Sequence, residues 1–359
     1  MIVSLALVKA GELILFYERI AQALGASAEE AGVFARCLVR ADLRGMYTQG
    51  AAIVPYMVSM VEKRLMRFGA PFTILREEAA LALIDGGHGV GSVVSTRAMN
   101  LAIGKAKAAG TCSVWVRNGG DFAMTSNHAM QALEHDQVGI ATRNGSPRVA
   151  PWGGRKAFFG TNPISVAIPT GKEAPIVIDM ASGSFSVGQV VMAARDRRLL
   201  PSKHLVDDHG VYTDDPLAII VDPTDRESAF SGAIATLGHK GFAWSLIVEL
   251  FAGLLSGMGT SNLNDYEPSA ERPWNEGIFL MAIDITKLRP VGEFKAAADE
   301  LVRALRAVEP AADFRRVIVP GELEADKEWR FEREGVPIRE EDWRGLLDTA
   351  ARLGVEPAG

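Results

Sequence analysis

The feature that most constrains the fold is a succession of strand, helix and strand between residues 80 and 118. ALALIDG (80–86) and TCSVWVRN (111–118) have the apolar character of buried strands, and residues 92–109 between them have the spacing of an amphipathic helix. This succession is typical of a layered α/β body, in which helices cover a sheet. Further strands are predicted at 137–144, 164–169, 174–180, 217–222 and 278–284.

A glycine-rich segment, IDGGHGVG (84–91), lies between the first of these strands and the helix, where a dinucleotide-binding fingerprint would stand. The fingerprint G-x-G-x-x-G needs a third glycine five residues after the first. Here Gly87 and Gly89 are followed by Ser92 at that place. The segment is therefore predicted to be a turn between strand and helix, and the fold is not predicted to be a standard Rossmann domain.

Helical patterns dominate the two ends of the chain. The first residues indicate a strand and then a helix, and Ser27 with Glu30 forms the signature of a capping box before an apolar series that ends near residues 44–45. A further helix is expected at 55–63, and others at 291–308 and 340–354. The segment 242–255 is apolar nearly all round, so we expect it to be a helix buried in the core.

Composition and charge exclude several classes of protein. The chain has 359 residues, of which 48% are hydrophobic and 23% charged, as in an ordinary globular enzyme. Its net charge of −6 is spread along the chain without a basic stripe, so nucleic acid is not an expected partner. No apolar run approaches the roughly 20 residues of a membrane span, and no secretory signal pattern opens the chain, so we expect a soluble, cytoplasmic protein.

Metal and disulfide chemistry have little support in the sequence. The two cysteines, Cys37 and Cys112, are far apart and are expected to be buried thiols in a reducing compartment. The six histidines include no pair at H-x-x-x-H spacing and no cluster with cysteine, so no metal site is predicted.

Four segments carry a specific resemblance. VAPWGGRKAFFGTNPISVAIP (149–169), PIVIDMA (175–181), LGHKGFAWSLIVELFAGLLSG (237–257) and VPGE (319–322) occur in this order. They resemble sequence blocks of the malate/L-lactate dehydrogenase family, which includes ureidoglycolate, sulfolactate and diketogulonate dehydrogenases and reductases of cyclic imino acids. The similarity extends from about residue 5 to residue 354.

The resemblance implies a homodimeric NAD- or NADP-dependent oxidoreductase with a non-Rossmann α/β fold, a site shared by both protomers and a small-molecule substrate. It implies an N-terminal helical arm (1–75) packed with the C-terminal segment, an α/β cofactor-binding body (76–260), and a C-terminal part (261–359) whose strand and helices complete the fold. The family's cofactor contacts would fall on residues that follow strand 111–118 or lie in the resembling blocks: Phe122, Ala123, Met124, Thr125, Thr161, Asp179, Met180, Ala181, His239, Lys240, Gly321 and Glu322.

These residue types suit a nucleotide. Lys240 offers a cation for a phosphate, Thr161 a hydroxyl, and the glycines of GHKG and PGE let backbone donors approach closely. Taken singly, each has a plainer explanation. A lone lysine is usually a solvated surface charge, and GTNP can be a turn in which Thr and Asn bond their own backbone.

The catalytic segment departs from the family pattern. The family reads Arg-Gly-His-x-Ser-His-Gly-x-x-Arg, in which the second His donates a proton to the substrate carbonyl and the last Arg grips its carboxylate. Residues 44–53 here read Arg-Gly-Met-Tyr-Thr-Gln-Gly-Ala-Ala-Ile. Gln49, in place of the second His, can donate a hydrogen bond but has no proton to release near neutral pH. Tyr47, Thr48 and Gln49 are therefore predicted to be polar contacts of the substrate.

A second family block, Ser-x-His-Phe-Gly, appears here as residues 119–123, with Asp121 at the position of the histidine. Gln189 occupies the position at which some members have an acidic partner for the histidine. Asp121 is the new acid/base candidate, but an aspartate before FAMTSNHAMQAL also suits a helix N-cap. If the chain oxidises malate or lactate readily, segment 44–53 is misaligned, and His128 is then the next candidate for the acid.

Two functional hypotheses follow. In the first, the chain is an NAD(P)-dependent oxidoreductase whose small substrate is not a standard 2-hydroxy or 2-oxo acid. In the second, it binds a nucleotide without redox turnover, as a non-redox enzyme or as a binding subunit. Turnover of a reducible substrate separates the two hypotheses.

Overall fold

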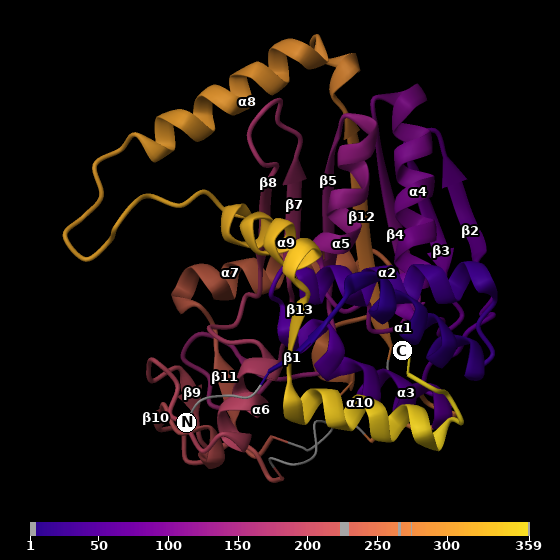
Figure 1. The fold of residues 1–359 in the computed structure, drawn as a ribbon, viewed down its shortest axis with the longest axis vertical. Helices are drawn as coiled ribbons and strands as arrows, with labels where there is room; N and C mark the ends of the chain where they lie inside the picture. Colours follow the sequence, from indigo (N-terminus) through magenta and orange to yellow (C-terminus); the bar gives the residue numbers. More distant parts are fainter. Residues whose placement is uncertain (1–4, 223–229, 265–266, 274, 358–359) are drawn as a thin grey trace.

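A seven-stranded mixed sheet forms the centre of the computed structural model, which describes residues 5–222, 230–264, 267–273 and 275–357. Helices cover the sheet on both faces, and those on one face are seen in front of it in Figure 1, so the α/β class predicted from the sequence is confirmed. The strands lie in the order β2 (Thr73–Glu78), β3 (Leu81–Asp85), β4 (Thr111–Gly119), β12 (Glu276–Asp284), β5 (Gln137–Arg143), β7 (Ile164–Ile168) and β8 (Ile176–Met180).

The strand–helix–strand unit predicted between residues 80 and 118 is present. β3 and β4 are parallel and are joined by α4 (Gly91–Ala109). Among the strands that the structure describes in this sheet, the other neighbours are all antiparallel. The sheet therefore differs from the all-parallel sheet of a Rossmann domain, in agreement with the failed glycine fingerprint.

The strand β12 comes from the last quarter of the chain but lies between β4 and β5. Phe279 pairs with Trp115 of β4 on one side and with Thr142 of β5 on the other. This insertion brings the end of β4, the end of β5 and the start of β12 to one edge of the sheet, because β12 is antiparallel to both neighbours.

The two faces of the sheet are covered differently. α4 and α5 (Ser126–Met130) pack on the face visible in Figure 1, against buried residues of β4 and β12 such as Val114 and Leu280. The opposite face carries Trp115 and Phe279, which pack against Val248 and Ala252 of the helix described below. Side chains thus alternate between two apolar layers along each central strand.

The N-terminal and C-terminal ends of the chain form a joint helical layer. β1 (Leu5–Val8) pairs antiparallel with β13 (Val336–Arg339), and α1 (Ala10–Ala23), α2 (Ala28–Leu43), α3 (Val54–Glu62) and α10 (Glu340–Arg352) share one apolar cluster (Figure 1). The predicted capping box is confirmed. The Ser27 hydroxyl accepts a hydrogen bond from the Glu30 amide at 3.2 Å, and the Glu30 carboxylate accepts one from the Ser27 amide at 3.2 Å.

A second, smaller sheet has the order β10 (Tyr212–Thr213), β9 (Leu205–Val206), β11 (Ala233–Ala235) and β6 (Val149–Ala150). It packs with α6 (Val187–Arg195) around a separate apolar cluster. The prediction of a strand at 217–222 is wrong, because these residues form a short helix and a turn. Asp215 accepts a hydrogen bond from the Leu217 amide and begins a 3-10 helix at Pro216, and Ile219 and Ile220 are buried beyond that turn.

The prediction of a buried helix at 242–255 is wrong in part. α7 (Gly238–Val248) continues into a π-helix (Glu249–Leu254), and one side of both packs on the sheet. The other side is exposed and is here called the leucine face. It consists of Leu246, Ile247, Leu250, Leu254 and Leu255, which are 43–56% exposed.

Over the residues described, no helix combines the length and the apolar character required to cross a bilayer.

Candidate active site

A polar cavity of about 140 Å³ opens at the edge of the sheet where β4 and β5 end and β12 begins. Asp121 follows β4, Arg143 ends β5 and Glu276 starts β12. Gln49 and Ile53 reach the cavity from the segment before α3, and Thr161 from the turn before β7. The fold thus joins Asp121, Gln49 and Thr161, three of the residues singled out in the sequence, in one cavity.

Arg143 lies between two carboxylates in this cavity. Its Nη1 atom donates a hydrogen bond to Glu276 Oε2, and its Nη2 atom is 3.3 Å from Asp121 Oδ2. The guanidinium also stacks over the Phe122 ring at 5.0 Å. Burial raises the pKa of Glu276 to about 7, against the opposing effect of Arg143 and with a further contribution from the charge on Asp121.

Asp121 is not a helix cap. α5 begins only at Ser126, and its N-cap is Thr125. Asp121 Oδ1 accepts a hydrogen bond from the Ala123 amide at 2.8 Å, and Ala123 has a φ of +61°, which breaks the helical path. The capping explanation is therefore wrong, and the aspartate instead closes a tight turn and contacts Arg143.

The segment that carries Thr48 and Gln49 consists of two 3-10 helices, Tyr47–Gln49 and Ala51–Ile53. The buried Asp42 holds it, because both carboxylate oxygens accept a hydrogen bond from the Ala51 amide at 2.9 Å. Gln49 lines the polar cavity. Thr48 instead packs on Gly188, where an added Cβ would lie 2.5 Å from the Thr48 Cβ.

Gln189 has a local role. Its side-chain oxygen accepts a hydrogen bond from the Ser186 amide at 2.9 Å, and the Ser186 hydroxyl accepts one from the Gln189 amide at 3.2 Å. These bonds form the capping box of α6, and Gln189 is exposed. The position that we compared with an acidic partner is thus used to begin a helix.

A second cavity, of about 280 Å³, lies along β8 and is here called the β8 cavity. Met124, Asp179, Met180 and Gly321, all predicted cofactor contacts, line it together with Arg44. Asp179 Oδ2 accepts a hydrogen bond from the Ser126 amide at 2.8 Å. Burial raises the pKa of Asp179 to about 6, against the opposing effect of the bonds from Ser126.

Gly321 is required at its place beside β8. Its φ is +90°, and an added Cβ would lie 2.8 Å from the Val177 amide nitrogen. The Pro320 carbonyl accepts a hydrogen bond from that amide at 3.1 Å. The PGE turn therefore lies directly against β8, and its Pro320 and Gly321 form part of the wall of the β8 cavity.

Hydrogen bonds of the residue after Ala181 bring together three of the segments predicted to contact the cofactor. The Ser182 amide, next to Ala181, donates to the Thr161 carbonyl at 2.9 Å, and the Leu237 amide donates to the Ser182 carbonyl at 2.9 Å. Thr161, Ala181 and the start of α7 are therefore neighbours. His239 and Lys240 are exposed in the first turn of α7 and line neither cavity.

Other predicted residues are enclosed. Phe122 is fully buried, Ala123 and Thr125 are 6% and 3% exposed, and the Phe122 ring packs edge-on against His128 at 4.9 Å. Burial lowers the pKa of His128 to about 4, and the imidazole is completely covered and lines neither cavity. His128 is thus a core histidine, and its nomination as the next acid is wrong.

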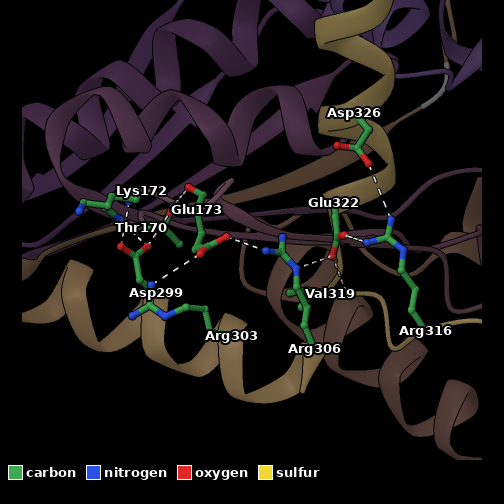
Figure 2. Close-up of polar contacts among 11 residues, drawn as sticks. Thr170, Lys172, Glu173, Asp299, Arg303, Arg306, Arg316, Val319, Glu322 and Asp326 are labelled. Carbon is green, nitrogen blue, oxygen red and sulfur yellow. Dashed lines mark hydrogen bonds and ion pairs between the residues drawn. The ribbon is translucent and has the colours of Figure 1, made fainter. Parts of the chain in front are cut away.

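The side chain of Glu322 lies in an ion-pair network rather than in the β8 cavity (Figure 2). Glu322 contacts Arg306 of α8 (Val291–Arg306) at 3.2 Å and also contacts Arg316, and it begins α9 (Glu322–Glu334). Burial alone would raise the pKa of Glu322, but the Val319 amide and the two guanidinium groups hold it below its ordinary value. The side chain is already satisfied by protein partners.

The same network ties α8 to the hairpin between β7 and β8 (Figure 2). Asp299 accepts hydrogen bonds from the amides of residues 171–173 at 2.8–3.2 Å. Glu173 pairs with Arg306 at 2.6 Å and with Arg303 at 3.6 Å. These contacts hold α8, which lies at the outer end of the hairpin in Figure 1, and so fix the approach of the PGE turn to β8.

The polar cavity contains buried polar atoms without a partner. Arg143 Nε, Ser146 Oγ and Asn162 Oδ1 make no hydrogen bond with any residue that the structure describes. Because a buried polar atom left unpaired costs free energy, these atoms are suited to bind a small polar molecule or water. Among all the residues that the structure describes, no group of three or more His, Cys, Asp or Glu side chains is arranged to hold a metal ion.

The chain belongs to the malate/L-lactate dehydrogenase family, whose model matches residues 8–347. It is 31% identical to L-sulfolactate dehydrogenase of Methanothermobacter thermautotrophicus, over 96% of each chain. It is also 31% identical to the Δ¹-pyrroline-2-carboxylate/Δ¹-piperideine-2-carboxylate reductase of Pseudomonas syringae pv. tomato, over 94% of this chain and 95% of the relative. The structure of malate dehydrogenase from Pyrococcus horikoshii superposes with a TM-score of 0.88 at 29% identity and 99% coverage of both chains.

The family and its fold, predicted from the four blocks, are thus confirmed. The relatives are dehydrogenases and reductases with small-molecule substrates, which supports an oxidoreductase here. Dehydrogenases of this family generally use a nicotinamide cofactor. Arg143 and Glu276 were not singled out in the sequence. In the sequence each is only a charged residue at the end of a predicted strand. The two lie close together because β12 inserts beside β5, and the sequence does not reveal this.

Proposed function

We propose that the chain is an NAD(P)-dependent oxidoreductase that binds the cofactor along β8 and a small polar substrate in the polar cavity. The observation that carries this proposal is a hydrogen bond that joins the lining of the polar cavity to the segment that follows β8. Thr161 lines the polar cavity, and its carbonyl accepts the amide of Ser182, which follows β8 by two residues. A nicotinamide ring bound at the end of β8 would then adjoin the substrate and supply a hydride to it.

The chain's own residues fit such a cofactor. The β8 cavity offers Asp179 as an acceptor and the buried Arg44, whose Nε atom has no hydrogen-bond partner within the described chain. Gly238 has a φ of +59° and begins α7, so the amides of the first turn and the Lys240 ammonium would face a phosphate there. Glu322 would contribute through its position in the PGE turn, since its side chain is occupied.

The substrate is proposed not to be a standard 2-hydroxy or 2-oxo acid. Ile53, at the position of the family's carboxylate-binding arginine, lines the polar cavity, and Gln49 stands at the position of the proton-donating histidine. Arg143 does not simply replace the missing arginine, because its guanidinium is already paired with Asp121 and Glu276. Thr48 supports the site from behind through Gly188.

Cofactor binding is tested by titrating NADH and NADPH against the fluorescence of the six tryptophans. We expect one of them to bind, and we expect Lys240→Ala to weaken it by about 1.5–3 kcal/mol, or roughly 10-fold to 100-fold, through loss of a charge-assisted contact. Lys203→Ala, an exposed lysine away from both cavities, is the matched control. Failure of both nucleotides to bind at millimolar concentration would sink the proposal.

Turnover is tested by following the oxidation or reduction of the nicotinamide cofactor in the presence of each of a panel of small compounds. Malate, lactate, sulfolactate and ureidoglycolate should react poorly or not at all, because Ile53 cannot make the charge-assisted hydrogen bond with which the family's arginine holds their carboxylate. Carbonyl and imine compounds without a 2-oxo acid group should be reduced faster. Robust malate or lactate oxidation would show that segment 44–53 is wrongly aligned, and cofactor binding without any turnover would favour the non-redox hypothesis.

We further propose that the chain is a homodimer that buries the leucine face against a second copy. A contiguous row of exposed leucines is unusual on a monomer and marks an interaction surface. Sedimentation at micromolar concentration should give about twice the mass of 38.5 kDa.

The double change Leu250→Glu with Leu254→Glu should shift that mass toward the monomer, because it places charges in the proposed interface. Leu288→Glu, on a residue that is 77% exposed elsewhere, is the control and should leave the mass unchanged. A monomer before any substitution rules out a site shared by two protomers.

A further inference from the structure

The carboxyl group of Glu276 lines the polar cavity beside Arg143. Its Oε2 atom is bonded to Arg143 Nη1, and its Oε1 atom points toward Gly145, where even an added Cβ would stay 3.4 Å away. Gly145 also lines the cavity, so the glycine leaves room beside Oε1 for a ligand atom. The residue is 8% exposed and lines the cavity wall.

We propose that Glu276 is the proton donor of this site, and that Arg143 positions it. The proposal rests on the proposed oxidoreductase function and assigns its acid. It replaces Asp121 in that role, because both oxygens of Asp121 are engaged, Oδ1 by the Ala123 amide and Oδ2 by Arg143. Asp121 anchors the guanidinium from the other side.

The charges around Arg143 explain how a glutamic acid can keep its proton. One guanidinium faces two carboxylates, so a negative charge is left over when both are ionised. Burial of Glu276 makes that excess charge costly, and a pKa of about 7 allows the acid to be protonated at neutral pH. An acid with a pKa near the working pH is the most effective proton donor.

The step balances with a nicotinamide as hydride source. The substrate carbon of a C=O or C=N group receives a hydride, that is two electrons and one proton, from the reduced nicotinamide, which is oxidised. The substrate oxygen or nitrogen takes a proton from the Glu276 carboxyl group, whose O–H bond breaks. Glu276 is left as a carboxylate bonded to Arg143 and regains its proton from water in the open cavity.

Titration of the carboxyl group tests the first half of this inference without any cofactor. In protein carrying ¹³C at the glutamate carboxyl carbon, the resonance missing from Glu276→Gln should titrate near pH 7 in the wild type. Arg143→Gln should raise that midpoint, and Asp121→Asn should lower it, because they remove a positive and a negative neighbour respectively. A midpoint near the ordinary glutamate value of about 4.3 would overturn the proposal.

Turnover of the fastest compound in the carbonyl and imine panel tests the second half. Glu276→Gln should lower kcat about 100-fold or more, with unchanged cofactor affinity, and should remove the fall in rate above pH 7. In Arg143→Gln that fall should begin at a higher pH, and in Asp121→Asn at a lower pH. Glu62→Gln, another arginine-paired carboxylate that lines neither cavity, should leave the rate and the profile unchanged.

The two proposals fail in different ways. If Glu276→Gln keeps the wild-type rate and pH profile, the oxidoreductase function stands and the assignment of the acid is wrong. If the wild type binds no nicotinamide or reduces no compound of the panel, the proposed function is wrong and the proton donor is wrong with it.

Discussion

Replacement of Gly91 by alanine should destabilise the protein by about 3 kcal/mol, the upper part of the range for overpacking a close contact. Gly91 begins α4, and an added Cβ would lie 2.0 Å from the Gly120 carbonyl oxygen and 2.4 Å from that of Asp121. These are backbone atoms, which cannot move aside as a flexible side chain would. The loss is measured as a lower urea midpoint at an unchanged slope.

The same helix offers the control. Gly104 is exposed in the middle of α4, and an added Cβ meets nothing within 4 Å. Gly104→Ala should therefore be neutral or stabilise by up to about 1 kcal/mol, as alanine does in a helix interior. Equal stability of the two variants would show that α4 does not press on the turn at Gly120–Asp121. The prediction gives a physical reason for the glycine-rich segment that failed the dinucleotide fingerprint: its last glycine lets a helix approach the loop that carries Asp121.

Replacement of Arg143 by methionine should cost about 3–5 kcal/mol at pH 8, because it leaves the buried carboxylate of Glu276 and the partly buried one of Asp121 without their cation. The loss should be smaller at pH 5. The folded-state pKa of Glu276, about 7, lies above the unfolded value of 4.5, so the folded protein holds this proton more tightly. The stability that this proton contributes is present below pH 4.5 and is lost as the pH rises through 7.

Without Arg143 the folded-state pKa of Glu276 rises further above its unfolded value. The free energy of unfolding of the variant therefore falls with rising pH over a wider range of pH than that of the wild type. Urea unfolding of both proteins at pH 5 and pH 8 measures the difference. Arg117→Met is the control: Arg117 pairs with Asp85 at 3.0 Å while 41% exposed, and its loss should cost about 1 kcal/mol or less at either pH. A penalty for Arg143→Met that is the same at both pH values would contradict the charge arrangement described for the polar cavity.

The parts of the fold that the sequence predicts are those with local causes. The capping box at Ser27, the long helix after Gly91 and the strands at 111–118 and 278–284 follow from residue spacing within a few turns or pleats. The position of β12 between β4 and β5 has no local cause, because it depends on pairing across more than 130 residues. The exposed side of 242–255 was missed because an apolar surface has the same composition whether it faces the core or a partner.

The site was predictable to the extent that the family blocks locate it. The blocks point to Gln49, Asp121 and Thr161, which do meet at one cavity, and to Asp179 and Gly321, which meet at the other. They give no signal for Arg143 and Glu276, which come together only because β5 and β12 pair at Arg143 and Ile278. His128 shows the opposite error, since a suitable residue type is buried in the core, and the side chain of Glu322 is likewise occupied by ion pairs within the fold.

The central place of β12 also governs how the chain is completed during synthesis. β4 and β5 are neighbours of β12 and not of each other, so each has an open edge until residues 276–284 leave the ribosome. Open, apolar strand edges are sites of wrong pairing between chains. The protein therefore carries these open edges from the synthesis of β4 until that of β12, and a chaperone that shields them in this interval would act on β4 and β5 first.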